Sequence, residues 1–192
     1  MDNINHHLLF ASRHGVTETI IKLLKHGTAD INAKDDYGRT PLIYASTSGY
    51  TEIAKLLIHN NANPNITDHY GVSPLMLISK YGYTSTLKPL IDAGADINTK
   101  DIYGLTALIL SSMRGHVDIV KMLIEAGADV NAKDNKGRTA SNYEKYPGII
   151  TRAREKIDKE NDERIDILDI AMTGDNIYTI KGNIGILVKS FL

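Results

Sequence analysis

One interval of 33 residues recurs along most of this chain of 192 residues, and two series of glycines mark it. The first series consists of Gly38, Gly71, Gly104 and Gly137, each preceded three residues earlier by an aspartate. The second series consists of Gly15, Gly49, Gly82, Gly115 and Gly148, with a first interval of 34 residues and later intervals of 33. Because a unit of this length cannot bury its own apolar face, the period predicts stacked units that share one core.

Each period predicts two short helices followed by a polar turn. In the fourth unit, Thr106 is a suitable N-cap for a first helix, and Gly115 can end that helix in the left-handed conformation. Apolar residues at helical spacing predict a second helix from His116 to Glu125, which Gly127 ends. The Asp, Asn and Gly residues that follow predict a tight turn, in which side chains accept hydrogen bonds from backbone N–H groups.

The pattern resembles a known family. Residues 38–65 read GRTPLIYASTSGYTEIAKLLIHNNANPN, which is similar to the ankyrin repeat, and the resemblance extends from about residue 5 to residue 140. It implies an all-α ankyrin-repeat solenoid of stacked helix-turn-helix units, with β-hairpin-like loops that project at roughly right angles. It also implies a non-enzymatic function, the recognition of another protein.

The resemblance divides the chain into six parts. These are residues 1–34 as an N-terminal capping repeat, 35–67, 68–100 and 101–133 as ankyrin repeats, 134–150 as a degenerate C-terminal capping repeat, and 151–192 as a charged segment with an apolar C-terminal tail. Eleven of the sixteen residues in 151–166 are charged, which predicts either an exposed helix or a linker. The tail is expected either to pack on the array as a helix or to form a hairpin that turns at Lys181, Gly182 and Asn183.

Two departures from the family pattern predict a less stable array. The family usually has a histidine after Thr-Pro-Leu that links neighbouring turns, and this chain instead has Ile43, Met76, Ile109 and Asn142 there. The third unit has Pro89 inside its second helix, at a position usually occupied by leucine. Because proline lacks a backbone donor, we expect it to kink that helix and to destabilise the protein by up to about 3 kcal/mol.

Composition excludes several functional classes. The net charge is −1 and the pI is about 6.6, so no global basic field favours nucleic acid as a partner. Cysteine is absent, which excludes disulfides and cysteine-ligated zinc. The chain does not begin with the basic and apolar stretch of a signal peptide, and it has no apolar run of the about 20 residues that a membrane helix needs. Neither element is therefore expected. We therefore expect a protein that is cytoplasmic, or exported without a recognisable signal peptide.

Catalytic, cofactor and metal sites are also not expected. The sequence contains none of the nucleophile, metalloprotease, Walker or Rossmann motifs. The seven histidines fall mostly at different repeat positions, and the recurring Asp and Asn residues lack the order of a calcium-binding loop. We therefore expect no enzymatic activity, no cofactor and no bound metal.

The candidate binding residues centre on three tyrosines that share one repeat position, Tyr37, Tyr70 and Tyr103. In the family this position lies at the hairpin tips on the concave side, so the three rings are expected on one face. The residues around them vary between units, as a recognition surface requires, and exposed Tyr and Arg are common interface anchors. The partner-binding set is completed by Asp36, Arg39, Thr47, Ser48, His69, Val72, Lys80, Tyr81, Ile102, Leu105, Met113 and Arg114. A second reading, compatible with the first, has the tyrosines packing on each other to stiffen the loops.

Two functions follow from different classes. In the first, the chain is a non-catalytic module that binds a protein partner through the hairpin tips and the concave helix face. In the alternative, it is a structural or oligomerising fragment of a longer array that uses its apolar C-terminal tail. The abundance of Ile, Lys, Asn and Tyr resembles proteins of AT-rich genomes, in which ankyrin proteins often act on host proteins.

Overall fold

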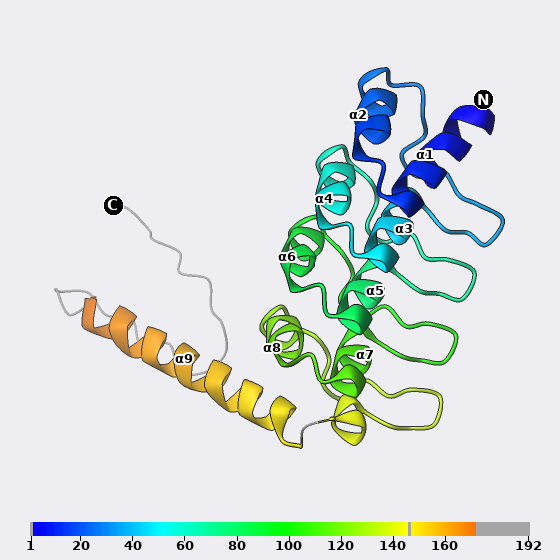
Figure 1. Ribbon diagram of the computed structural model, residues 1–192. Coiled ribbons are helices and arrows are strands. Elements are labelled where there is room, and N and C mark those ends of the chain that lie inside the picture. The colour runs from blue at the N-terminus through cyan, green and yellow to red at the C-terminus, as the bar shows by residue number, and fades with distance from the viewer. Residues whose placement is uncertain (1, 146, 172–192) are drawn as a thin grey trace, which may run out of the picture. The chain divides into compact units, whose positions relative to one another are not determined.

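The computed structural model describes residues 2–145 and 147–171, which form helices and turns and contain no strand. The first helices of the units make an inner row of α1 (Asp2–His14), α3 (Pro41–Ser48), α5 (Pro74–Tyr81) and α7 (Ala107–Arg114). The second helices make an outer row of α2 (Thr17–Lys25), α4 (Thr51–His59), α6 (Thr84–Asp92) and α8 (Val117–Glu125). Figure 1 shows the two rows side by side, with the long loop after each outer helix projecting beyond the inner row. The all-α solenoid of stacked helix-turn-helix units predicted from the sequence is therefore confirmed for the described residues.

Helices of the inner row begin and end with side chains suited to those positions. The hydroxyls of Thr40, Ser73 and Thr106 each accept a hydrogen bond of 3.3 Å from the backbone N–H three residues later. A glycine with positive φ follows each of these helices, as at Gly115, where φ is 75°. Because only glycine adopts this conformation without strain, the glycine series of the sequence marks helix ends, as predicted.

Helices of the outer row begin differently. Their N-cap residues, Tyr50, Tyr83 and His116, form no capping hydrogen bond through their side chains. Each of these side chains instead lies over the glycine that ends the inner helix of the preceding unit. A Cβ atom added to Gly49 would lie 2.5 Å from the Tyr83 ring, and one added to Gly82 would lie 2.7 Å from the His116 ring. Gly15, Gly49 and Gly82 of the second glycine series are therefore required by space as well as by conformation.

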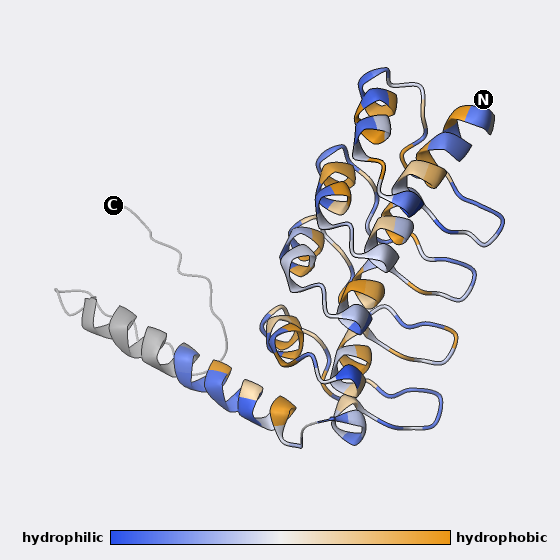
Figure 2. Cartoon of the chain, in the orientation of Figure 1, coloured by the Kyte–Doolittle hydropathy of each residue, from blue (hydrophilic) through white to orange (hydrophobic). Residues whose placement is uncertain are grey.

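One apolar core runs through the array without interruption. It extends from Leu8 to Ile150 and takes buried residues from the helices of both rows. Figure 2 shows the hydrophobic residues concentrated on the helices and mostly polar residues on the projecting loops. Ile43, Met76 and Ile109, which replace the usual histidine, are at most 1% exposed and belong to this buried interior. These positions therefore contribute apolar packing in place of hydrogen bonds.

Hydrogen bonds between neighbouring units supplement the core at two places. The side chains of Asn32, Asn65 and Asn98 each accept a bond of 2.7–2.9 Å from a backbone N–H of the next unit. The backbone carbonyls of Tyr37, Tyr70 and Tyr103 each accept a bond of 3.0 Å from the next loop. Neighbouring turns are thus linked without the histidine network of the family.

Pro89 does not interrupt the helix that contains it. Helix α6 has nine residues, as do α4 and α8, and the N–H of Ala93 donates to the carbonyl of Pro89 at 3.1 Å. Leu87 and Leu90 on the same helix are fully buried and hold it against the core. The expected loss of stability at Pro89 stays a prediction.

The last repeat ends in a short 3-10 helix, η1 (Ala140–Tyr143), which packs against α7 in the place of a further inner helix. Helix α9 (Ile149–Ala171) follows, and the Glu144 carboxylate accepts hydrogen bonds from the first backbone N–H groups of that helix. Of the two alternatives for the charged segment, the structure therefore has the helix. Contacts divide the chain into two units, Met1–Arg154 and Glu155–Leu192. The predicted turn at residues 181–183 and the apolar end of the tail lie outside the described residues.

Candidate functional site

The projecting loops and the exposed sides of the inner helices form one face of the compact unit Met1–Arg154 (Figure 1). We call this face the inner surface. Tyr37, Tyr70 and Tyr103 lie on its loops and are 56%, 54% and 63% exposed. Within the part of the chain that the structure describes, no contact joins two of these rings. The tyrosines therefore face solvent separately, and mutual packing does not stiffen the loops.

An aspartate holds the backbone on both sides of each of these tyrosines. One oxygen of Asp35 accepts hydrogen bonds from the N–H groups of Tyr37 and Arg39, at 2.9 and 2.8 Å. In the next two repeats, Asp68 and Asp101 accept the equivalent pairs of hydrogen bonds, at 2.8–2.9 Å. The predicted role of the Asp residues in a turn is thus confirmed, and each exposed ring projects from a fixed backbone.

The remaining predicted residues fall into two groups on this surface. Asp36, His69 and Ile102 are exposed at the loop tips, whereas Arg39, Val72 and Leu105 are half-buried at the base of the loops. On the helices, Thr47, Ser48, Tyr81, Met113 and Arg114 are exposed and Lys80 is partly exposed. His69 also packs on the preceding loop, since a Cβ atom added to Gly38 would lie 2.7 Å from its ring.

Sequence reasoning missed a hollow of about 310 Å³ at the amino-terminal end of the inner surface. It is lined by His6, Leu9, Phe10, Arg13, Asp35, Asp36, Tyr37, Arg39 and Tyr44. The Arg39 guanidinium lies 4.5 Å from the centre of the Tyr37 ring and 4.9 Å from that of Tyr44, and Arg13 lies 5.7 Å from the Tyr44 ring. The hollow therefore combines aromatic rings with two guanidinium groups.

One carboxylate organises this hollow. Asp35 forms an ion pair with Arg39 at 2.9 Å and accepts a hydrogen bond of 2.6 Å from the Tyr44 hydroxyl. Burial opposes the ionisation of Asp35, but the hydrogen bonds from Tyr44 and from two backbone N–H groups outweigh it and lower its pKa. Asp35 therefore stays ionised at neutral pH and neutralises Arg39.

The same three residue types recur three periods later. Asp134 forms an ion pair with Arg138 at 3.0 Å and accepts a hydrogen bond of 2.6 Å from the Tyr143 hydroxyl. That hydroxyl is the main cause of the lowered pKa of Asp134. The two units between these ends have aliphatic residues at the Arg and Tyr positions, which are Val72, Leu77, Leu105 and Leu110. A signal existed in the sequence, because Arg and Tyr occur together at both ends and are replaced together in the middle.

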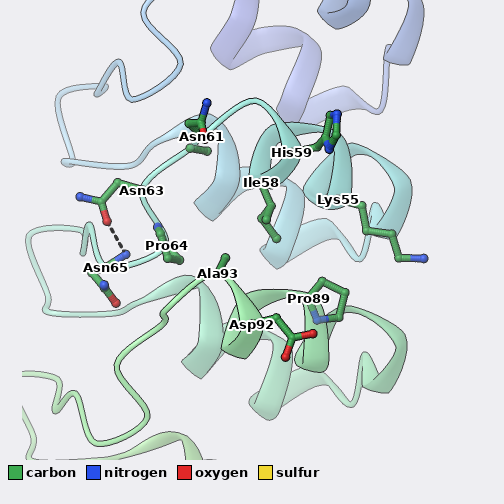
Figure 3. A pocket seen from close by; sticks show the side chains of 11 residues that line it. Lys55, Ile58, His59, Asn61, Asn63, Pro64, Asn65, Pro89, Asp92 and Ala93 are labelled. Carbon is green, nitrogen blue, oxygen red and sulfur yellow. Dashed lines mark hydrogen bonds between the residues drawn. The ribbon is translucent and has the colours of Figure 1, made fainter.

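A second hollow, of about 770 Å³, lies along the outer helices α4 and α6 and the loops that follow them (Figure 3). Its lining includes Pro89, His59 and three asparagines, of which Asn63 accepts a hydrogen bond from the N–H of Asn65. Its one carboxylate, Asp92, is bound to Lys88 at 2.7 Å. No set of groups suited to catalysis converges in this hollow.

The described residues contain no group of three or more side chains placed to hold a metal ion. None of the helices in that part of the chain is both long and apolar enough to cross a membrane. A family model described as "Ankyrin repeats (3 copies)" matches residues 2–68 and 75–143. No curated protein matches the sequence significantly.

Proposed function

The chain belongs to the ankyrin-repeat family, and we propose that its inner surface binds a protein partner. Ankyrin repeats are generally protein–protein interaction modules. The observation that carries the proposal for this surface is the series of three tyrosines, each more than half exposed on a turn that an aspartate holds. Large aromatic side chains supply much of the binding energy at protein interfaces.

A fixed backbone strengthens such a surface. Each tyrosine loop is held by aspartate side chains, by hydrogen bonds to the next loop and by the common core. Binding therefore orders few groups that are mobile in the free protein, and less of the interaction energy is lost to entropy. The side chains around the tyrosines differ from unit to unit, so that the same backbone supports recognition of one particular partner.

No catalytic step is part of this proposal, and ankyrin repeats are typically non-catalytic. The carboxylates with lowered pKa, Asp35 and Asp134, are saturated by hydrogen bonds from backbone N–H groups, an arginine and a tyrosine. Groups so occupied stabilise turns and are poorly placed to exchange protons with a substrate.

The test replaces Tyr37, Tyr70 and Tyr103 together by alanine and compares the proteins captured from a cell lysate by mass spectrometry. We expect a set of specifically captured proteins to disappear, while the helical circular dichroism stays unchanged. The control replaces Lys22, Lys55 and Lys88 by alanine, since these residues lie on the outer helices α2, α4 and α6, away from the tyrosine loops. Capture that survives the tyrosine substitutions would refute binding through this surface.

The alternative, an oligomerising role for the apolar tail, depends on residues outside the described part of the chain. It therefore stays a hypothesis, and no contact within the compact unit Met1–Arg154 favours it.

A further inference from the structure

Charge is distributed differently over the two rows of helices. The inner helices α3, α5 and α7 contain no acidic residue, whereas each outer helix contains at least one. Three of the five lysines on the outer helices form ion pairs within their own helices, in the pairs Glu18–Lys22, Glu52–Lys55 and Lys88–Asp92, at 2.7–3.1 Å, and the outer helices contain as many acidic residues as lysines. The outer row is therefore electrically balanced and well solvated.

Three cations of the inner surface have no such partners. Among the described residues, Arg13, Lys80 and Arg114 form no ion pair with a carboxylate. Arg13 and Lys80 lie over the rings of Tyr44 and Tyr81, at 5.7 and 5.3 Å. An arginine or lysine that faces aromatic rings and lacks an anion is ready to pair with a carboxylate from another molecule.

Few negative charges oppose these cations on the inner surface. Asp35 and Asp134 are each paired with an arginine of the same loop. Asp36 is exposed at one loop tip and borders the amino-terminal hollow. Asp68 and Asp101 form no ion pair, but each accepts two backbone N–H bonds within its own loop. The inner helices α3, α5 and α7 therefore carry only positive charge, on Lys80 and Arg114, although the whole chain has a net charge of −1.

Apolar side chains fill the middle of the same surface. Val72, Leu77 and Leu105 are partly or fully buried there, while Met113 and Ile102 are 40% and 51% exposed. Arg13 lies at the amino-terminal end of this apolar middle and Arg114 at its carboxyl-terminal end, one on α1 and the other on α7. The order along the array is thus a cationic end, an apolar middle with Lys80 at its edge, and a second cationic end.

We propose that the partner segment bound by the inner surface is an acidic peptide with apolar residues in its middle. This inference rests on the proposed function and names the chemistry of the partner. The apolar part of the peptide covers the central side chains, and its carboxylates pair with Arg13, Lys80 and Arg114. The hollow between Phe10, Arg13 and Tyr37 receives one acidic side chain, with Arg13 as its hydrogen-bond donor.

Nucleic acid fits this arrangement less well. A phosphate backbone binds through a continuous series of cations, and here the three unpaired cations are separated by aliphatic side chains. Those aliphatic groups would lie against charged phosphates and lose the benefit of their burial. Carboxylates spaced by apolar residues match both features of the surface.

The test pans a phage library of random 12-residue peptides on the immobilised full chain and then measures synthetic copies of the enriched peptides by fluorescence anisotropy. We expect the enriched peptides to contain more Asp and Glu than the starting library, around aliphatic or aromatic residues. Replacing Arg13, Lys80 and Arg114 together by glutamine should raise the Kd by about tenfold or more, since three charge pairs are lost. Replacing Lys22, Lys55 and Lys88 by glutamine changes the net charge equally and should raise the Kd less than about twofold.

The outcomes separate this inference from the proposed function. Enriched peptides without an acidic bias, which nevertheless lose binding to the tyrosine triple variant, would overturn the inference and leave the proposed function intact. Peptides that bind the tyrosine triple variant unchanged would contradict both. Displacement of an acidic peptide by a fluorescein-labelled 24-nucleotide single-stranded DNA of equal or higher affinity would also overturn the inference. Failure to enrich any peptide counts against it as well, while the lysate capture tests the proposed function independently.

Discussion

The inner and outer rows of helices repeat with the same period but are stabilised in different ways. Inner helices share a hydroxyl N-cap and a terminal glycine, while their exposed side chains change from unit to unit. Outer helices lack side-chain N-caps, and α2, α4 and α6 each contain one internal ion pair. Because the inner row is fixed at its ends, its exposed face can vary without loss of the fold, and the recognition that we propose depends on that face.

The largest change in folding stability is expected from a substitution at the place where the inner and outer rows meet. Gly49 ends inner helix α3 with φ of 72° and lies under the Tyr83 ring, whereas Gly94 follows outer helix α6 with φ of 83° and has no atom near its missing Cβ. Replacing Gly49 by alanine should destabilise the protein by about 3 kcal/mol, since the left-handed strain and the clash with Tyr83 add.

The matched control is Gly94→Ala, which introduces only the left-handed strain and should cost about 1 kcal/mol. Chemical denaturation of both variants measures the difference. Equal losses of stability would show that the contact between Tyr83 and Gly49 is not tight, and the distinction between the ends of the two rows would then fail.

The repeat itself could be predicted from local sequence, because caps, glycines and turn aspartates act within a few residues of each other. Thr106 and Gly115 have the predicted roles at the two ends of α7, and the loops are built as expected. The hollow around Arg13 and Tyr44 was not predicted. Its residues lie far apart in the sequence and meet only because α1 stacks on α3, so that no local rule brings them together.

Pro89 shows that the effect of a residue on its own helix also depends on packing, which local sequence does not reveal. Its chemistry predicted a kink and a loss of stability, and the structure shows that α6 keeps the length of its neighbours, with Leu87 and Leu90 fully buried against the core. The backbone hydrogen bond that Pro89 cannot form is still expected to destabilise this continuous helix. Which exposed residues of the inner surface bind a partner is likewise not contained in the repeat pattern, since the fold requires none of them.

Replacing Pro89 by leucine removes this difference between α6 and the other outer helices. The corresponding residues, Leu56 and Met122, are half-buried, so a leucine at this place fits without overpacking. We expect stability to rise by about 2–3 kcal/mol, because the helix regains a backbone donor and gains apolar contact. Thermal unfolding followed by circular dichroism measures it, and an unchanged or lower midpoint would contradict the prediction.

Buried hydroxyls provide a further contrast between the rows. Ser46 on inner helix α3 is fully buried, and its hydroxyl has no hydrogen-bond partner in the structure, as is also true of Ser12, Ser79 and Ser112. Thr86 on outer helix α6 is equally buried, but its hydroxyl donates to that of Thr51 at 3.0 Å. Ser46→Ala should therefore raise stability by about 1 kcal/mol, since an unsatisfied polar group is removed. Thr86→Val should lower stability by about 1 kcal/mol, because a satisfied hydrogen bond is lost. Loss of stability in Ser46→Ala, measured by urea denaturation, would show that this hydroxyl is satisfied.

The smallest effect concerns the ends of the outer row. Asn61 has a positive φ of 65°, at the position where the other outer helices are followed by Gly27, Gly94 and Gly127. Asparagine tolerates this conformation better than most residues but retains some strain, so Asn61→Gly should raise stability by about 0.5 kcal/mol. The reciprocal change, Gly94→Asn, should lower it by a similar amount, because space is open around Gly94 and only the backbone preference differs. Shifts of the same sign in both variants would show that a contact of the Asn61 side chain, rather than its backbone conformation, decides the stability of this helix end.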